Sequence, residues 1–71
     1  MVIGEKELLF TLGQRIKNIR QTKGLTQNVL VVRCHMDKST LSKIENGKVN
    51  ISYVTLYRIC KALEVSMHEI F

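Results

Sequence analysis

Apolar residues recur at intervals of three and four along most of the chain, and strict alternation is scarce. That spacing places apolar side chains on one face of an α-helix, because the helix turns once every 3.6 residues. The first such stripe consists of Leu9, Leu12, Ile16 and Ile19. This helix is expected to end at Gly24, after Lys23. Gly13 interrupts it at a cost of about 1 kcal/mol relative to alanine. We therefore expect the stable helix to begin near Gly13 and residues 1–8 to be frayed.

Polar residues that favour helix N-termini precede each of the later apolar stripes, because their side-chain oxygens can accept hydrogen bonds from the first turn. These residues are Thr26, Asp37, Ser52 and Ser66. Glu69 follows Ser66 at the spacing of a capping box. Asn46-Gly47 is expected to end the helix that Asp37 begins. The side chains expected to face the core are Leu30, Val31, Cys34, Leu41, Ile44, Leu56, Ile59, Cys60 and Leu63.

Five short helices with short connections predict a compact all-α fold, with a single domain spanning residues 1–71. The second and third helices are separated only by the few residues between Cys34 and Asp37. So short a connection cannot fold the helices back antiparallel, and it sets them at a steep angle, as in a helix-turn-helix unit. We expect this unit to cover about residues 27–46.

Length and composition fit one globular domain. The chain has 71 residues, of which 45% are hydrophobic and 24% are charged, a balance typical of folded proteins. No apolar run approaches the roughly 18 residues of a membrane span. The start, MVIGEKELLF, has acids where a signal peptide needs an apolar stretch. We therefore expect a cytoplasmic protein with no membrane partner, associated with the nucleoid if it binds DNA.

Positive charge is concentrated in the middle of the chain. Eleven lysines and arginines stand against six acids, which gives a formal net charge of +5. Eight of the cations but only two of the acids lie between Gln14 and Lys48. Concentrated positive charge favours a polyanionic partner such as a nucleic acid.

The cysteines and histidines do not indicate catalysis or metal binding. Cys34 and Cys60 are far apart, and His35 and His68 complete no ligand set. Both cysteines fall among apolar residues and are expected to be buried, reduced thiols. The adjacent Cys34 and His35 could form a nucleophile pair in principle, but no third residue or substrate pocket accompanies them. We expect no enzyme, cofactor, metal or small-molecule ligand.

Three stretches of the sequence together resemble the lambda-repressor-like helix-turn-helix family, also called the Cro/Xre type. They are LGQRIKNIRQTKGLTQ, STLSKIENGKVNIS and LYRICKALEVSMHEIF, which span most of the chain after residue 11. The phrases KGLTQ, IENGK and KALEVS are specific at these mutual spacings, although each is weak alone. VNISYVTLYRICKALEV is also similar to the controller proteins of restriction–modification operons. The resemblance implies a transcriptional regulator that binds specific double-stranded operator DNA through a recognition helix in the major groove.

The resemblance also implies roles for particular side chains. Arg20 would pair with Glu45, and the helix that begins at Lys38 would read bases. The pairing also follows from the residues themselves, since Glu45 shares a side of its helix with Leu41 and Ile44 and would meet the interior unless matched. A solvated Glu45 is the alternative. The residues implied to contact the DNA backbone are Thr26, Gln27, Thr40, Asn46, Lys48, Asn50 and Tyr53.

A helical wheel separates two sides of the third helix. At about 100° per residue, Ile44 and Glu45 fall within roughly 60° of Leu41 and define the buried side. Lysine donates to guanine O6 and N7, and serine can serve any base with a donor or acceptor. Lys38 falls about 60° from Leu41, but it lies in the first turn, which is the end that enters the groove first in this docking mode. An ordinary solvated helix face is the alternative. The residues expected to contact bases are Lys38, Ser39, Ser42 and Lys43.

The turn and the second helix depart from the family pattern. Family members usually have glycine where this chain has His35, so a non-glycine residue is expected at positive φ. They usually have alanine where this chain has Val31. Val29 and Val32 replace polar surface residues and could form a patch for a protein partner. With the unusual ELLF segment near the N-terminus, this patch supports the alternative function, an antitoxin-like protein-interaction module.

A homodimer is expected on DNA, because one short helix reads too little sequence for useful selectivity. Two half-sites would then lie about one helical turn, roughly 34 Å, apart and be related by a two-fold axis. The expected contact surface is the C-terminal end, residues 67–71, with part of the fourth helix. The segment from Leu8 to Leu12 is the less favoured choice. In the alternative arrangement, Ile70 and Phe71 cap the core of the monomer.

Overall fold

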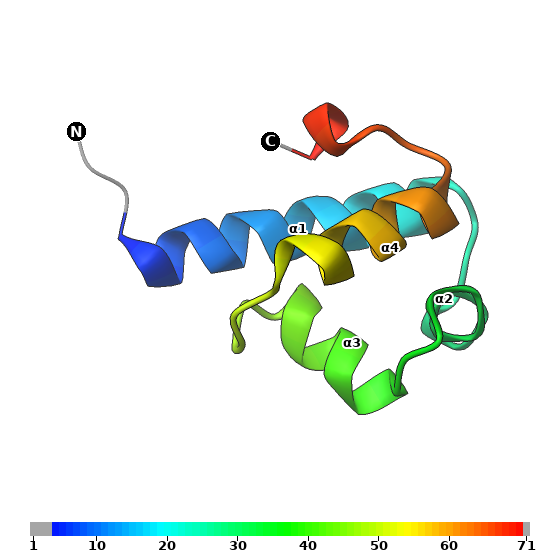
Figure 1. The fold of residues 1–71 in the computed structure, drawn as a ribbon, viewed down its shortest axis with the longest axis horizontal. Coiled ribbons are helices and arrows are strands. Elements are labelled where there is room, and N and C mark those ends of the chain that lie inside the picture. Colours follow the sequence, from blue (N-terminus) through cyan, green and yellow to red (C-terminus); the bar gives the residue numbers. More distant parts are fainter. Residues whose placement is uncertain (1–3, 71) are drawn as a thin grey trace.

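The computed structural model describes residues 4–70, and within this range it consists of four α-helices and one 3-10 turn (Figure 1). Their bounds are α1 (Glu5–Thr22), α2 (Gln27–Cys34), α3 (Lys38–Glu45), α4 (Tyr53–Leu63) and η1 (Met67–Glu69). The predicted all-α fold is confirmed, except that the expected fifth helix is the 3-10 turn η1. Its Ile70 N–H donates to the Met67 carbonyl three residues back, which is the 3-10 pattern. The predicted contact of the capping box forms, since the Ser66 N–H donates to the Glu69 carboxylate at 2.9 Å.

Helix α1 begins at Glu5, well before Gly13, where the sequence predicted its start. Glu5 and Glu7 in the first turn place negative charge at the positive end of the helix dipole, which stabilises this end. Residues 5–8 are therefore helical rather than frayed, and residues 1–3 of that prediction lie outside the described part of the chain. One internal glycine costs less than the packing of the buried face of α1 contributes.

Gly13 lies in the middle of α1, where this helix crosses α3. A Cβ atom at residue 13 would lie 2.3 Å from the carbonyl oxygen of Ile44 and 2.7 Å from that of Glu45. Both oxygens belong to the backbone and cannot rotate away, so α1 and α3 approach this closely only because residue 13 has no side chain. The prediction that Gly13 marks a helix boundary was wrong, because the glycine serves a close contact between helices.

Gly13→Ala is expected to lower the free energy of unfolding by roughly 1–3 kcal/mol, because α1 and α3 must move apart to admit a methyl group. Helix propensity alone predicts the opposite sign, a gain of about 1 kcal/mol. Urea unfolding followed by circular dichroism distinguishes the two. Asn18→Ala is the matched control, since Asn18 lies on the exposed side of the same helix. A Gly13→Ala protein that is more stable than wild type would contradict the close approach.

Side-chain caps and left-handed residues define the helix ends. The Thr26 hydroxyl accepts from the Val29 N–H at 3.1 Å, and the Ser52 hydroxyl accepts from the Thr55 N–H at 3.1 Å. Both predicted caps are confirmed. Asp37 occupies the N-cap position of α3, but its side chain makes no capping hydrogen bond, so that part of the prediction was wrong.

The turn between α2 and α3 depends on a residue in the left-handed region. His35 has φ 56° and ψ 52°, which confirms the positive φ expected from its place in the family pattern. The His35 N–H donates to the Val31 carbonyl and closes the last turn of α2. A left-handed residue here redirects the chain within three positions, which sets α3 at a steep angle to α2.

The core is formed where α2 packs against α3 and α4 and where α1 packs against α3. Its buried apolar residues are Leu12, Ile16, Leu30, Cys34, Leu41, Ile44, Leu56, Ile59, Cys60, Leu63 and Ile70. The inward residues predicted from Leu30 onward are therefore buried, apart from Val31, which packs partly buried against this core. Of the first stripe, Leu12 and Ile16 are buried, whereas Leu9 and Ile19 are only half-buried. Ile70 is only 1% exposed. It caps the core of the monomer, so it is excluded from the expected C-terminal dimer surface.

Candidate nucleic-acid interface

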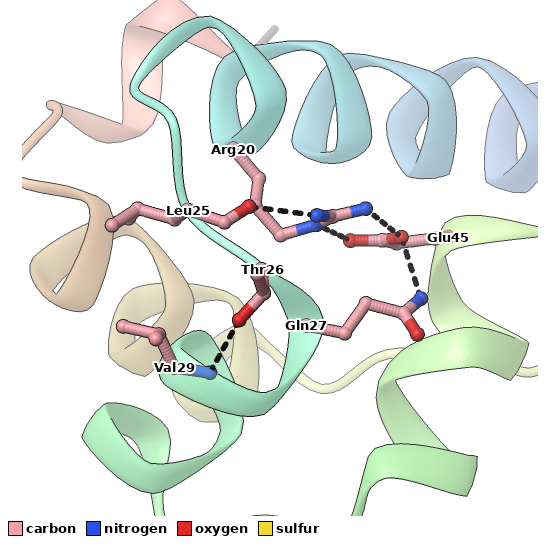
Figure 2. Close-up of polar contacts among 6 residues, drawn as sticks. All are labelled: Arg20, Leu25, Thr26, Gln27, Val29 and Glu45. Carbon is pink, nitrogen blue, oxygen red and sulfur yellow. Dashed lines mark hydrogen bonds and ion pairs between the residues drawn. The ribbon is translucent and has the colours of Figure 1, made fainter.

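A buried ion pair joins α1 to α3. It lies on the buried side of α3, behind the residues predicted to contact DNA. Arg20 is 7% exposed and Glu45 is 2% exposed. The Arg20 Nε donates to Glu45 Oε2 at 2.7 Å, and Nη2 donates to Oε1 at 3.1 Å. Arg20 Nη1 donates to the Leu25 carbonyl at 2.8 Å, as Figure 2 shows. Two parallel charge-assisted bonds and this third bond satisfy both groups in the interior. The predicted pair is present in the structure.

Gln27, at the start of α2, also bonds to Glu45. Its Nε2 donates to Glu45 Oε1 at 2.9 Å, so α1, α2 and α3 converge on one carboxylate (Figure 2). The sequence predicted only a DNA backbone contact for Gln27, and no local signal could have revealed a partner so distant along the chain. An amide group carries two N–H donors and one acceptor oxygen. One donor holds the Gln27 side chain in place, and the other donor and the oxygen have no protein partner in the described residues.

The outer side of α3 is polar and accessible to solvent. Figure 1 shows α3 at the edge of the molecule, with α2 on one side and the loop from α3 to α4 on the other. Ser42 is only half-buried, rather than fully outward as the wheel suggested, because it flanks the buried Leu41. Gln27 is also half-buried. The other residues predicted to contact DNA are exposed, namely Thr26, Lys38, Ser39, Thr40, Lys43, Asn46, Lys48, Asn50 and Tyr53.

The exposed lysines of this surface have no ionic partner within the described part of the chain. Within residues 4–70, the side-chain ion pair is the one between Arg20 and Glu45. Lys38, Lys43 and Lys48 therefore keep their positive charges available to an external anion. The opposite side of α3 carries Leu41, Ile44 and Glu45 into the core, so one short helix has a structural side and a charged, solvent-facing side.

The cysteines occupy the core and not a reactive site. Burial raises the pKa of the Cys34 thiol above its ordinary value of 9.0. Burial, and secondarily the nearby Glu69 carboxylate, raises the pKa of the Cys60 thiol. Both thiols are therefore protonated near neutral pH, which is the unreactive form. His35, beside Cys34, is exposed, so the nucleophile pair considered from the sequence has one buried, protonated member.

Between residues 4 and 70, the structure has no group of three or more cysteine, histidine or acidic side chains arranged to hold a metal ion. In the same range, no helix combines the length and the apolar character that crossing a bilayer requires.

Comparison with known proteins identifies the family. Residues 11–70 match a family model described as a helix-turn-helix domain. The control protein C.MunI of a Mycoplasma species is 32% identical over 66 residues, which cover 92% of this chain and 89% of that protein. Antitoxin HipB of Escherichia coli is 36% identical over 56 residues, or 79% of this chain and 60% of HipB.

Two solved structures of controller proteins superpose closely on this fold. The restriction–modification controller C.AhdI from Aeromonas hydrophila aligns with a TM-score of 0.86 and 33% identity, over 89% of this chain and 96% of that chain. The controller C.Esp1396I, solved as a tetramer with its natural 35-base-pair operator, aligns with a TM-score of 0.79 and 35% identity, over 89% and 93% of the two chains. Both of these solved proteins are restriction–modification controllers. This chain therefore belongs to the helix-turn-helix family of Xre-type, lambda-repressor-like DNA-binding transcription regulators.

Proposed function

We propose that this protein binds specific operator DNA as a homodimer and inserts α3 into the major groove. The observation that carries the proposal is the two-sided character of α3. One side is anchored to α1 and α2 through Glu45, and the other presents exposed lysines and small hydroxyl side chains to solvent. The operator complex of the similar controller C.Esp1396I supports the assignment.

Base contacts would come from the outer side of α3. Lysine ammonium groups donate to guanine O6 and N7, and serine hydroxyls can donate or accept. Lys38 and Ser39 lie in the first turn, which enters the groove first in this docking mode. Ser42 and Lys43 lie one turn later. Short serine side chains let the helix backbone approach the bases closely.

Phosphate contacts would position α3 without reading sequence. Gln27 lies at the N-terminus of α2, where free N–H groups and the helix dipole favour an anion. Its bond to Glu45 fixes the amide, so the second N–H has a defined direction before DNA arrives. The other residues proposed to contact phosphates are Thr26, Thr40, Asn46, Lys48, Asn50 and Tyr53.

Lys43→Ala is expected to weaken binding to the preferred duplex by about 1–3 kcal/mol and to relax selectivity at one base position per half-site. Lys48→Ala should instead weaken binding to all duplexes alike and lower the salt slope by about one unit for each phosphate that the protein no longer neutralises. The measurement is the affinity of each variant for a duplex selected from random DNA and for a scrambled duplex of equal length. Lys23→Ala, at the exposed end of α1, is the control. Equal losses on both duplexes for Lys43→Ala would exclude α3 as the reader.

The homodimer is proposed to form through the C-terminal surface expected from the sequence, except that the buried Ile70 takes no part in the contact. Met67 is partly buried there, and Val54 on α4 is 59% exposed. Val54→Asp is expected to convert the dimer to monomer in sedimentation equilibrium, because a carboxylate would be buried in an apolar contact. Phe10→Asp is the matched control, since Phe10 is exposed on the less favoured N-terminal segment. A wild-type monomer that binds one half-site as tightly as a palindrome would contradict the dimer, and dissociation by Phe10→Asp alone would move the contact to α1.

A protein-interaction module is the second candidate. Val29 and Val32 are exposed, and with Asn28 and Arg33 they line a shallow hollow on α2. The similarity to antitoxin HipB supports a protein partner. The DNA measurements discriminate between the two functions. The protein-interaction function is favoured if DNA affinity stays unchanged in each of four alanine variants, at Gln27, Lys38, Lys43 and Lys48.

A further inference from the structure

A groove of about 580 Å³ lies between the last turn of α2 and the C-terminal half of α4. Its floor includes Cys34, which is buried, and Ala62, which is partly buried. The remaining lining residues are exposed, namely Arg33, His35, Tyr57, Arg58, Lys61 and Glu64. None of the lining residues belongs to α3 or to the loop that precedes α4. The groove is therefore distinct from the surface proposed to bind DNA.

Three cations surround this groove without ionic partners in the described residues. The ion pairs among the described residues involve none of Arg33, Arg58 and Lys61. Arg33 Nη1 does donate a long hydrogen bond, of 3.4 Å, to the Ala62 carbonyl. Arg58 and Lys61 are three residues apart on one helix, a spacing at which like charges destabilise the helix. Glu64 at the rim and the negative end of the α4 dipole, near Lys61, offset part of this repulsion. An external anion would relieve it.

The lining favours a peptide over a duplex as the source of that anion. The Tyr57 side chain is 52% exposed beside the three cations, so the groove offers an aromatic surface together with donors for carboxylates. The guanidinium group of an arginine binds a carboxylate through two parallel hydrogen bonds. A flexible acidic segment with an apolar side chain can enter a concave site of this size, whereas a stiff duplex seated on α3 would need to bend towards a separate surface.

We propose that this groove binds an acidic peptide segment of a protein partner. Carboxylates of the segment bind Arg33, Arg58 and Lys61, and an apolar side chain packs on Tyr57. Such a contact would give the protein a second docking surface beside the one proposed for DNA. The proposal does not depend on the DNA-binding function, because the groove shares no residue with that surface.

The test measures binding of a fluorescent peptide with glutamates on both sides of one leucine, followed by anisotropy at low salt. The double variant Arg58→Glu and Lys61→Glu is expected to lose about tenfold or more in affinity, because attraction becomes repulsion. The control double variant, Arg15→Glu and Lys23→Glu, changes the net charge equally at exposed sites of α1 and its C-terminal end, outside the groove. It should retain most of the affinity. A peptide with glutamine in place of glutamate should bind weakly to the wild-type protein.

Any of five outcomes would overturn the proposal. Equal losses in both double variants would mean that only net charge matters. Equal binding of the glutamine peptide, or no binding of the glutamate peptide to the wild-type protein, would exclude carboxylate recognition. A loss of duplex affinity in the groove variant with unchanged peptide binding would assign the groove to DNA. A changed oligomeric state in sedimentation, again with unchanged peptide binding, would assign it to a second copy of the chain.

Discussion

Glu45→Gln is expected to lower the free energy of unfolding by roughly 3–5 kcal/mol, because the Arg20 guanidinium would keep its charge in the interior without a counter-ion. Small domains are stable by only about 5–15 kcal/mol in total, so this variant should melt at a markedly lower temperature. Arg20→Met should have a similar effect, since it leaves the Glu45 carboxylate buried with only the Gln27 amide beside it. Thermal and urea unfolding of the two variants measure the loss.

The double variant, Arg20→Met with Glu45→Gln, provides the sharper comparison. Removing both charges should cost clearly less than the sum of the single changes, because no unpaired charge remains. Glu5→Gln is the matched control, since Glu5 is exposed in the first turn of α1 and makes no ion pair in the described structure. Single variants that unfold like wild type would show that the Arg20–Glu45 pair contributes nothing to stability.

The affinity for the preferred duplex is expected to fall roughly 10³–10⁵-fold between 50 and 200 mM salt, for a dimer that makes about 6–10 phosphate contacts. The physical cause is the release of counterions from DNA by lysines such as Lys48, which has no ionic partner in the described residues. Arg20 should add nothing to this slope, because its guanidinium is already engaged by Glu45 and Leu25. Anisotropy titrations across a salt series measure the slope.

Two comparisons make the salt series decisive. The scrambled duplex should show a similar slope with lower affinity, because phosphates are the same in both sequences. The Lys48→Ala protein should show a shallower slope than wild type on both duplexes. An affinity that hardly changes with salt would mean that few phosphates are contacted, and it would argue against the proposed DNA function.

Much of the fold could be predicted from the sequence because periodicity and capping are local properties. The stripe Leu56, Ile59, Cys60 and Leu63 is buried as predicted, and Thr26 and Ser52 cap their helices as predicted. Gly13 was misinterpreted because helix propensity describes an isolated helix. Its actual role depends on the backbone of α3, some thirty residues later, which no local pattern contains.

The ion pair behind the candidate site was predictable for a similar, local reason. The position of Glu45 among apolar residues indicated that it needs a partner, and Arg20 is that partner. The bond from Gln27 to Glu45 was not foreseen, since it depends on the crossing angle of α2 and α3, which a sequence does not specify residue by residue. The burial of the residues near the C-terminus was harder to predict. Ile70 could equally have capped the core or faced a partner, and in the structure it is buried in the core.

The division of α3 into two sides has a practical consequence for protein engineering. The side that holds the fold together uses Leu41, Ile44 and Glu45, and the side proposed to touch bases uses none of them. Residues at positions 38, 39 and 43 are exposed, and substitutions at such positions usually change stability by less than about 0.5 kcal/mol. A library randomised at these three positions should therefore yield mostly folded proteins, so that new operator preferences can be selected without rescuing the scaffold.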